Sequence, residues 1–343
     1  MSSPDTLSEE QQLKQFLAHI TLPQKEKLPE HVKRPKVIVI AGPTCVGKTK
    51  HSLIIAKALA GEVVSADSMQ VYRGMDIGTA KVTQEERKEV PHYLIDIREL
   101  TQTFNVVDFY MEAMRAIRSI LARDRVPVVV GGTGFYLHAL IYGPPSGPPS
   151  EPDLRAQLEG EMDAKGPEAL FERLEGLDPD YAATITRNDK QKIVRGLEII
   201  SLTNDKVSRF KSGRESEQHY DFRCWFLHMP REILYPYIEM RCDEMIAAGL
   251  IDEVKQLAEC ELGSNLSASQ AIGYRQCLEF LSSDQSHEDF DNFVSRFKQA
   301  SRQYAKRQFT WFKREPLFRW LNIENIPLDR SSELIIQDYE LSF

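Results

Sequence analysis

Short apolar runs alternate with amphipathic segments from residue 36 to about residue 142. Buried strands are predicted where the runs are continuous and β-branched, at 37–41, 62–66, 93–97 and 126–132. Helices are predicted where apolar residues recur with helical spacing, at 48–60, 106–123 and from Phe135 onward, with a short helix in the polar stretch after residue 66. Strands that alternate with helices form a parallel sheet covered on both faces. The pattern therefore predicts an α/β core.

The pattern changes at the proline-rich stretch GPPSGPPSEP, residues 143–152, which can continue neither a helix nor a central strand. Residues 152–204 are helical in pattern and contain no strand candidate. The apolar run RCWFLHM, 223–229, then predicts a strand that resumes the sheet. Further helices are predicted at 231–247, 250–260, 270–282 and 288–312.

The helical block therefore looks like an insertion into the α/β core. The predicted organisation is a flexible N-terminal extension (1–35), a core made of two segments (36–143 and 220–325), a helical insertion domain (144–219) and a C-terminal tail (326–343).

Composition places the chain among globular proteins. It has 343 residues, of which 42% are hydrophobic and 27% charged. We expect no membrane association, since no apolar run is long enough to span a bilayer and the N-terminus lacks a signal-peptide pattern. The five cysteines show neither CxxC spacing nor close pairing with histidines, so we expect a cytoplasmic protein without a zinc site or disulfides.

The net charge of −8 argues against a protein that coats nucleic acid, but it allows a local basic site. Residues 296–314 contain seven Lys or Arg residues and no acid. A solvated helix face is the simplest interpretation of this run. Its aromatic residues leave two alternatives, because they can face the core of one amphipathic helix or belong to a surface that meets nucleic acid. These aromatics are Tyr304, Phe309, Trp311 and Phe312.

A phosphate-binding loop is the most specific local motif. Residues 42–49, GPTCVGKT, lie between the first predicted strand and the first predicted helix, as such a loop requires. Backbone N–H groups and the helix N-terminus would face an anion, and Lys48 would add a charge. The hydroxyl of Thr49 is a possible Mg²⁺ ligand. The predicted anion-binding residues are Gly42, Pro43, Thr44, Cys45, Val46, Gly47, Lys48 and Thr49.

Two further polar residues fall at the same sheet edge. Asp67 follows the second predicted strand and Thr133 follows the fourth, and in parallel sheets this edge binds ligands. An ionised Asp67 can accept a proton from a weakly acidic nucleophile while a diphosphate departs. The structural alternatives are an N-cap role for Asp67 and a turn role for Thr133. A strand-terminal Mg²⁺-ligating Asp is missing, because Asp96 lies inside its run. This disfavours phosphoryl transfer.

Seven motifs occur together and in a fixed order: GPTCVGKT, SADSMQVYRGMDIGTAK, VPHYLIDI, VGGTGFYLHAL, RNDKQKIVRGLE, QAIGYRQ and YAKRQFTWF. Together they resemble the tRNA dimethylallyltransferase family of the bacterial type, over residues 36 to about 322. The resemblance implies a parallel-sheet core like that of P-loop NTPases, with an inserted all-helical domain that grips tRNA.

The resemblance implies that the loop holds the diphosphate of dimethylallyl diphosphate rather than a nucleotide, with Mg²⁺ assisting. Asp67 would be the general base, helped by Thr133. Lys48, Thr49 and the loop amides would bind the diphosphate, and Arg241 would be a further cationic contact.

On the acceptor side, the resemblance implies transfer to N6 of the adenosine 3′ of the anticodon (nucleotide 37), in tRNAs that read codons beginning with U. It also implies a monomer. The flipped adenosine would meet Asp67, Ser68, Met69, Gln70 and Thr133. The anticodon stem-loop would contact Gln191, Lys192, Ile193, Val194 and Arg195, and also Gln270, Gly273, Tyr274 and Arg275. Lys192 replaces the arginine that is usual in the family, which turns a fork-shaped contact into a point charge.

Three other functions compete with this interpretation. An adenylate isopentenyltransferase that modifies free AMP or ATP would share the loop and Asp67, but it would not need the helical insertion or the basic C-terminal helix. A P-loop kinase would need the missing Mg²⁺-ligating Asp. A non-catalytic tRNA-binding protein would not need Lys48, Thr49, Asp67 and Thr133 together.

Overall fold

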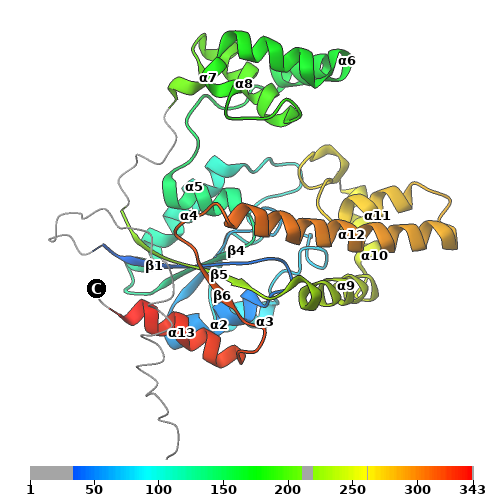
Figure 1. The fold of residues 1–343 in the computed structure, drawn as a ribbon. Coiled ribbons are helices and arrows are strands. Elements are labelled where there is room, and N and C mark those ends of the chain that lie inside the picture. The colour runs from blue at the N-terminus through cyan, green and yellow to red at the C-terminus, as the bar shows by residue number, and fades with distance from the viewer. Residues whose placement is uncertain (1–33, 211–218, 261, 342–343) are drawn as a thin grey trace, which may run out of the picture. The chain divides into compact units, whose positions relative to one another are not determined.

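The structure is a computed structural model that describes residues 34–210, 219–260 and 262–341 (Figure 1). The predicted N-terminal extension lies almost entirely outside these residues. The described residues form two compact units, one within residues 34–141 and 219–341 and the other within residues 142–210.

A six-stranded, all-parallel sheet forms the centre of the larger unit, in the order β3-β2-β4-β1-β5-β6. The α/β prediction is therefore confirmed. The strands are β1 (Lys36–Ala41), β2 (Glu62–Ser65), β3 (His92–Tyr93), β4 (Pro127–Gly131), β5 (Asp221–His228) and β6 (Arg319–Asn322). Residues 37–41 of the central strand β1 are fully buried, as its continuous apolar run requires.

Helices cover both faces of this sheet. Figure 1 shows α2 (Lys48–Ala58) and α13 (Leu328–Glu340) on one face and α4 (Val106–Leu121) and α5 (Gly134–Tyr142) on the other. The remaining helices of this unit are α3 (Gln84–Glu89), α9 (Arg231–Ala247), α10 (Leu250–Glu259), α11 (Tyr274–Leu281) and α12 (His287–Phe312). The long helix α12 packs against α9 and α11. No helix among the described residues is long and apolar enough to cross a membrane.

Two predicted segments differ from the structure. The strand expected at 93–97 ends at Tyr93, because Leu94 and Asp96 adopt left-handed backbone angles that a strand cannot contain. The predicted C-terminal tail, 326–343, instead contains helix α13, which packs on α2. Strand β6 was also not predicted.

The smaller unit is helical. It contains α6 (Pro152–Leu177), α7 (Pro179–Ala182) and α8 (Lys190–Thr203). Helix α6 is kinked at Gly166, where the backbone is left-handed and Pro167 follows. The core of this smaller unit is an apolar cluster between α6 and α8 that includes Leu174 and Leu197.

Candidate active site

The phosphate-binding motif forms a loop between β1 and the N-terminus of α2. Gly47 caps the helix with a φ of 90°, a conformation that favours glycine. Cys45 adopts a φ of 65°, which is uncommon for a residue with a side chain. The first turn of α2 carries no acidic residue, so nothing there offsets the positive end of the helix dipole. This geometry suits an anion.

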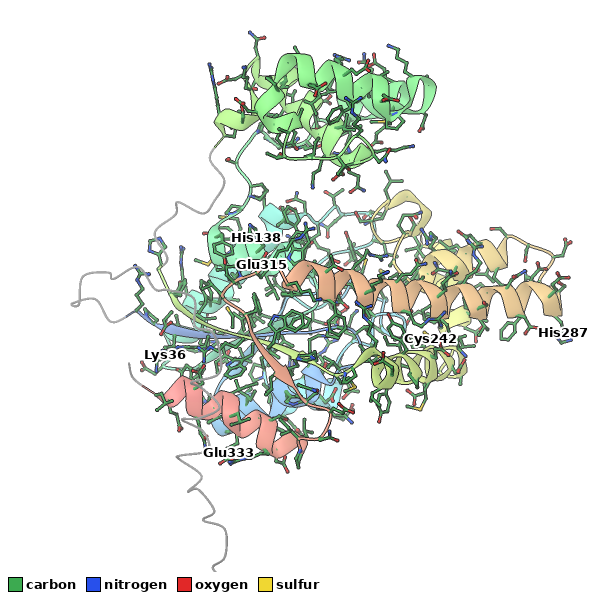
Figure 2. The ribbon with its side chains drawn as sticks, viewed as in Figure 1. Lys36, His138, Cys242, His287, Glu315 and Glu333 are labelled. Atoms are coloured by element: carbon green, nitrogen blue, oxygen red, sulfur yellow. The ribbon has the colours of Figure 1, made fainter. Side chains whose placement is uncertain are left out.

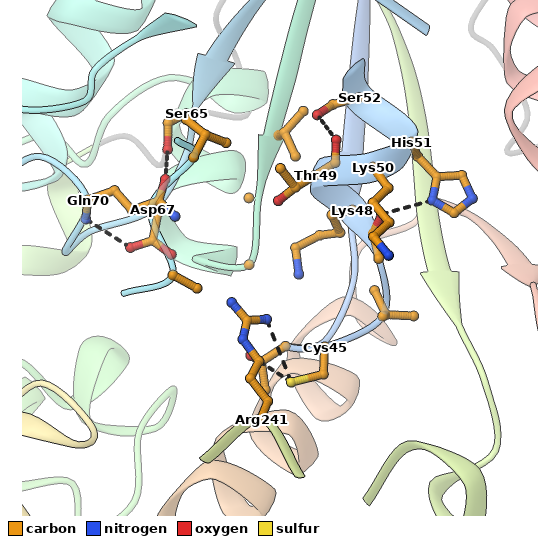
Figure 3. A pocket seen from close by; sticks show the side chains of 18 of the residues that line it. Cys45, Lys48, Thr49, Lys50, His51, Ser52, Ser65, Asp67, Gln70 and Arg241 are labelled. Atoms are coloured by element: carbon orange, nitrogen blue, oxygen red, sulfur yellow. Dashed lines mark hydrogen bonds between the residues drawn. The ribbon is translucent and has the colours of Figure 1, made fainter. Parts of the chain in front are cut away.

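Two cations face the loop (Figure 3). The Lys48 ammonium donates a hydrogen bond to the carbonyl oxygen of Pro43 at 2.7 Å. Burial lowers the pKa of Lys48 to about 8, and the nearby Arg241 guanidinium adds to this shift. Arg241 comes from α9, and its Nη1 lies 3.7 Å from Sγ of Cys45. The structure brings the two cations together in the wall of one cavity, and an anion between them would relieve their repulsion.

Asp67 lies just beyond β2, across the cavity from Lys48 (Figure 3). Its Oδ1 accepts hydrogen bonds from the backbone N–H groups of Met69 (2.8 Å) and Gln70 (3.2 Å). Gln70 is itself held, because its side chain bonds the Ser65 hydroxyl and the Thr79 carbonyl oxygen. The alternative role as an N-cap is therefore wrong, because no helix begins directly after Asp67. Its carboxylate instead closes a turn, and it also lines the cavity.

Thr133 belongs to a hydrogen-bond network that reaches the phosphate loop. Its Oγ1 accepts from the Ser68 N–H at 3.3 Å. It also hydrogen-bonds with Tyr304 of α12, whose hydroxyl further contacts Gln308. The buried amide of Gln308 accepts from the Thr44 N–H and donates to the Gly132 carbonyl oxygen, both at 3.0 Å. Gln308 therefore ties the phosphate loop to the loop that carries Thr133.

A second clamp holds the segment that follows Asp67. Glu253 of α10 accepts hydrogen bonds from three consecutive backbone N–H groups, those of residues 76, 77 and 78, at 3.0, 2.7 and 3.3 Å. Its Oε1 also accepts from the hydroxyl of the fully buried Tyr274 at 2.6 Å. Burial and the Glu253 carboxylate raise the pKa of Tyr274, so the hydroxyl stays protonated and donates.

These residues surround two cavities that share part of their walls. One measures about 870 Å³ and contains the phosphate loop, and the other measures about 310 Å³ and reaches towards α11. The shared lining residues are Thr44, Cys45, Asp67, Thr79, Arg241 and Tyr304. An anion in the loop and a second substrate entering from α11 would therefore meet beside Asp67.

The donor atoms in the larger cavity suit Mg²⁺ bound mainly through a diphosphate. Thr49 and Asp67 are oxygen donors in its wall, and Mg²⁺ typically takes only one or two protein oxygens beside phosphate and water. Asp96 serves another purpose, because it forms ion pairs with Lys81 and Arg87, both at 2.6 Å. These hydrogen-bonded ion pairs lower the pKa of Asp96 against the opposing effect of burial.

The α8 residues that are predicted to contact tRNA differ in their exposure. Gln191 and Lys192 are exposed, and Lys192 pairs with Asp189 at 3.0 Å. The prediction of direct contact is wrong for Ile193 and Val194, which are buried in the core of the smaller unit because α8 packs this face on α6.

Arg195 is also engaged inside the smaller unit. It pairs at 2.7 Å with Glu198, which is fully buried and also accepts from the Ser150 hydroxyl at 2.6 Å. Burial alone would raise the pKa of Glu198, but these hydrogen bonds lower it. Arg195 therefore stabilises the insertion, and its role towards tRNA stays a prediction.

The segment before α11 divides in the same way. Gln270 and Arg275 are exposed, and Gln270 lines the smaller cavity. Gly273 and Tyr274 are buried. The Tyr274 hydroxyl is engaged with Glu253, while the residue also lines the smaller cavity, so its contact with RNA stays a prediction. The sequence analysis missed Glu253, and it did not assign Tyr304 or Gln308 to the site. Hydrophobic periodicity predicts that all three residues lie on helices, but it does not predict that their side chains point into the site.

The fold and the site together define an α/β protein in which a phosphate-loop motif and a carboxylate line the same cavity. The sequence model of the family described as "IPP transferase" matches residues 70–315. The chain belongs to this family.

Its relatives have consistent names. The tRNA dimethylallyltransferase of Protochlamydia amoebophila (strain UWE25) is 55% identical over 97% of this chain and 98% of its own. The tRNA isopentenylpyrophosphate transferase structure from Bacillus halodurans is 39% identical, with a TM-score of 0.66 over 90% of this chain and 96% of that one. A eukaryotic dimethylallyltransferase, described as acting on tRNA, is 30% identical, with a TM-score of 0.70 over 85% of this chain and 75% of that one.

Proposed function

We propose that the protein transfers a dimethylallyl group from dimethylallyl diphosphate to N6 of an adenosine in tRNA, releasing diphosphate. The observation that carries this proposal is the position of Asp67, in the wall shared by the anion-binding cavity and the cavity that reaches α11. Membership in the IPP transferase family and relatives named tRNA dimethylallyltransferase support it.

The diphosphate of the donor occupies the phosphate loop. Loop N–H groups and the N-terminus of α2 bind its oxygens, while Lys48 and Arg241 neutralise their charge. Both cations act more strongly as the bridging oxygen leaves, because charge then builds on the diphosphate. Bound Mg²⁺, held beside Thr49, would supply further charge neutralisation at the same oxygens.

The transfer is a substitution at the first carbon of the prenyl group. The N6 lone pair forms a bond to this carbon as the bond from carbon to the diphosphate oxygen breaks. N6 loses one proton, and the Asp67 carboxylate accepts it. Thr133 is tied to the backbone N–H of Ser68 and to Tyr304. It therefore keeps the loop with Asp67 in register with the acceptor.

We propose tRNA rather than free AMP as the acceptor. The names of the relatives support tRNA. A free nucleotide would also leave the helical insertion and the exposed basic residues of α12 without a purpose. The proposed position is the adenosine 3′ of the anticodon in tRNAs that read codons beginning with U. The proposed active species is a monomer.

A three-way transfer assay tests this function. The protein and Mg²⁺ are incubated with dimethylallyl diphosphate labelled in the prenyl carbons, with either unmodified tRNA or AMP as acceptor. A third reaction contains ATP labelled in its γ-phosphate in place of the prenyl donor. The proposal predicts label on tRNA alone. Label on AMP alone would indicate an adenylate isopentenyltransferase, and phosphate transfer without prenyl transfer would indicate a kinase.

A further inference from the structure

The C-terminal segment that was predicted to be a tail forms one wall of the larger cavity. Helix α13 packs on α2, the helix that begins at the phosphate loop. Leu328 and Ser331, from the first turn of α13, line this cavity together with Ile323 and Ile326 from the preceding loop. The phosphate loop therefore shares its cavity with a helix that has no part in the function derived so far.

One buried histidine connects this helix to the phosphate loop. His51 of α2 is 2% exposed, and Figure 3 shows its ring on the side of α2 away from Asp67. Its Nδ1 lies 2.9 Å from the carbonyl oxygen of Gly47, and its Nε2 lies 2.8 Å from Oγ of Ser331, which is fully buried. The imidazole therefore bridges the phosphate loop and α13 directly.

Hydrogen-bond chemistry fixes which atoms donate in this bridge. A carbonyl oxygen can only accept, so Nδ1 of His51 carries the proton and donates to Gly47. Burial lowers the pKa of His51 despite this hydrogen bond, so the ring is neutral at neutral pH and its Nε2 accepts. The Ser331 hydroxyl donates to Nε2 rather than to the carbonyl oxygens of residues 327 and 328, which lie farther away at 3.1 and 3.0 Å.

The bridge acts on a peptide group that would contact the anion. The carbonyl oxygen of Gly47 and the N–H of Lys48 belong to one planar trans peptide and point in opposite directions. The Gly47 carbonyl oxygen also accepts the backbone N–H of His51 at 3.2 Å. Two hydrogen bonds to this oxygen therefore aim the Lys48 N–H out of the helix N-terminus, towards the position of an anion.

We propose that His51 and Ser331 are positioning residues for the donor diphosphate, because they hold the Gly47–Lys48 peptide in its anion-binding orientation before the donor arrives. The proposal rests on the proposed function and assigns part of the donor affinity to the contact with α13. Glycine allows many backbone conformations, so the peptide after Gly47 needs such support. A loop that is already in its bound orientation binds more tightly, since binding does not have to order it.

The test measures equilibrium binding of dimethylallyl diphosphate and, separately, of inorganic diphosphate to the full-length protein with Mg²⁺ present. One hydrogen bond accounts for roughly a two- to tenfold change in affinity, so Ser331→Ala should raise both dissociation constants by this factor. His51→Leu removes both ends of the bridge and should raise them further. His51→Asn places an amide nitrogen near the position of Nδ1, keeps the bond to Gly47, and should restore the affinity to that of Ser331→Ala.

Two controls on the same helix separate positioning from stability. Ser332→Ala removes an equally buried hydroxyl whose bond to the Leu328 carbonyl oxygen, at 2.8 Å, stays within α13. Glu333→Gln changes an exposed position of this helix (Figure 2). Neither variant should change the affinity for either ligand. In the His51→Leu background, Ser331→Ala should have no further effect on these affinities, as a coupled pair requires.

Kinetics distinguish positioning from catalysis. At saturating donor, kcat for prenyl transfer to tRNA should be unchanged in Ser331→Ala, because the bound diphosphate then holds the peptide itself. The KM for the donor should rise. The affinity for tRNA should also be unchanged, since neither His51 nor Ser331 lines the smaller cavity.

Wild-type affinity for both ligands in Ser331→Ala and His51→Leu, or an equal loss in Ser332→Ala, would overturn the positioning role. A fall in kcat with an unchanged donor KM would overturn it as well. Thermal unfolding shows whether each variant is folded, and Ser331→Ala decides the question if His51→Leu is not. Wild-type protein that binds inorganic diphosphate but transfers no prenyl group would overturn the proposed function alone, and inorganic diphosphate would still test the bridge.

Discussion

Replacing Asp67 by asparagine separates its chemical role from its structural one. The amide keeps an oxygen where Oδ1 accepts hydrogen bonds from Met69 and Gln70, so the loop should keep its shape. It loses the negative charge and the ability to accept a proton. A positioned general base contributes about 10²–10⁴ in rate, so kcat for prenyl transfer should fall by roughly this factor, or about 3–5 kcal/mol in barrier height.

Stability should respond differently. Asp67→Asn exchanges two charge-assisted hydrogen bonds for neutral ones, which costs about 1 kcal/mol of unfolding free energy or less. Asp67→Ala removes both bonds and should cost about 1–3 kcal/mol. The two variants should therefore share the loss of rate and differ in stability.

The assay combines single-turnover transfer to tRNA, equilibrium tRNA binding and thermal unfolding. Affinity for tRNA should stay within a few-fold of wild type, because removing a negative charge near RNA does not weaken binding. If Asp67→Asn kept more than about a tenth of the rate, Asp67 would not be the base. If tRNA affinity fell as far as the rate, its role would be in binding.

Three further predictions concern the residues around Asp67. Because the pKa of Lys48 is about 8 and diphosphate binding favours the charged form, donor Kd should be flat below pH 7 and should rise above pH 8 by up to about tenfold per pH unit. Tyr274→Phe removes the hydrogen bond to Glu253 and should lower the unfolding free energy by about 1–3 kcal/mol, and kcat as well, while donor Kd stays unchanged. Gln308→Met leaves the buried Gly132 carbonyl oxygen and the half-buried Thr44 N–H unpaired, so it should weaken donor binding and cost about 1–3 kcal/mol of stability, measured by calorimetry.

Each of these predictions has a matched control. Lys48→Arg keeps its charge at all these pH values, so the rise in donor Kd above pH 8 should disappear; its persistence would assign that step to another group. Tyr110→Phe, on α4, should change neither stability nor kcat. Gln303→Met, at an exposed position of α12, should leave donor binding intact. A Gln308→Met protein with wild-type donor affinity would show that the tie between the loops is dispensable.

Much of the fold could be predicted because several of its elements have strong local sequence patterns. The buried run of β1 and the loop before α2 each have one plausible structure. Parallel sheets bind ligands at the edge where their strands end, and this alone placed Asp67, Lys48 and Thr133 together without any knowledge of side-chain contacts. Strand β6 escaped prediction because four residues, RWLN, carry too little periodicity. The expected continuation of β3 ends at Tyr93, because Leu94 and Asp96 adopt left-handed backbone angles, and the Asp96 side chain pairs with Lys81 and Arg87.

The site residues that the sequence did not predict lie on helices, and their roles depend on which way each helix face points. Gln308 and Phe309 are neighbours on α12, yet one bridges two catalytic loops and the other packs on β5. Trp311 follows two residues later and is exposed. Sequence alone cannot assign such roles, because they depend on which elements pack around each face of the helix. The same holds for Ile193 and Val194, which a motif places near tRNA and the packing of α8 buries.

The most direct test of the account is nucleoside mass spectrometry of a tRNA that reads a codon beginning with U. The unmodified tRNA is incubated with the protein, Mg²⁺ and dimethylallyl diphosphate, digested, and compared with a reaction that contains Asp67→Asn. The account predicts that one adenosine, 3′ of the anticodon, gains a C5H8 unit on N6, with one diphosphate released for each transfer. An unmodified adenosine at that position, with the donor intact or its prenyl group on free AMP, would contradict it.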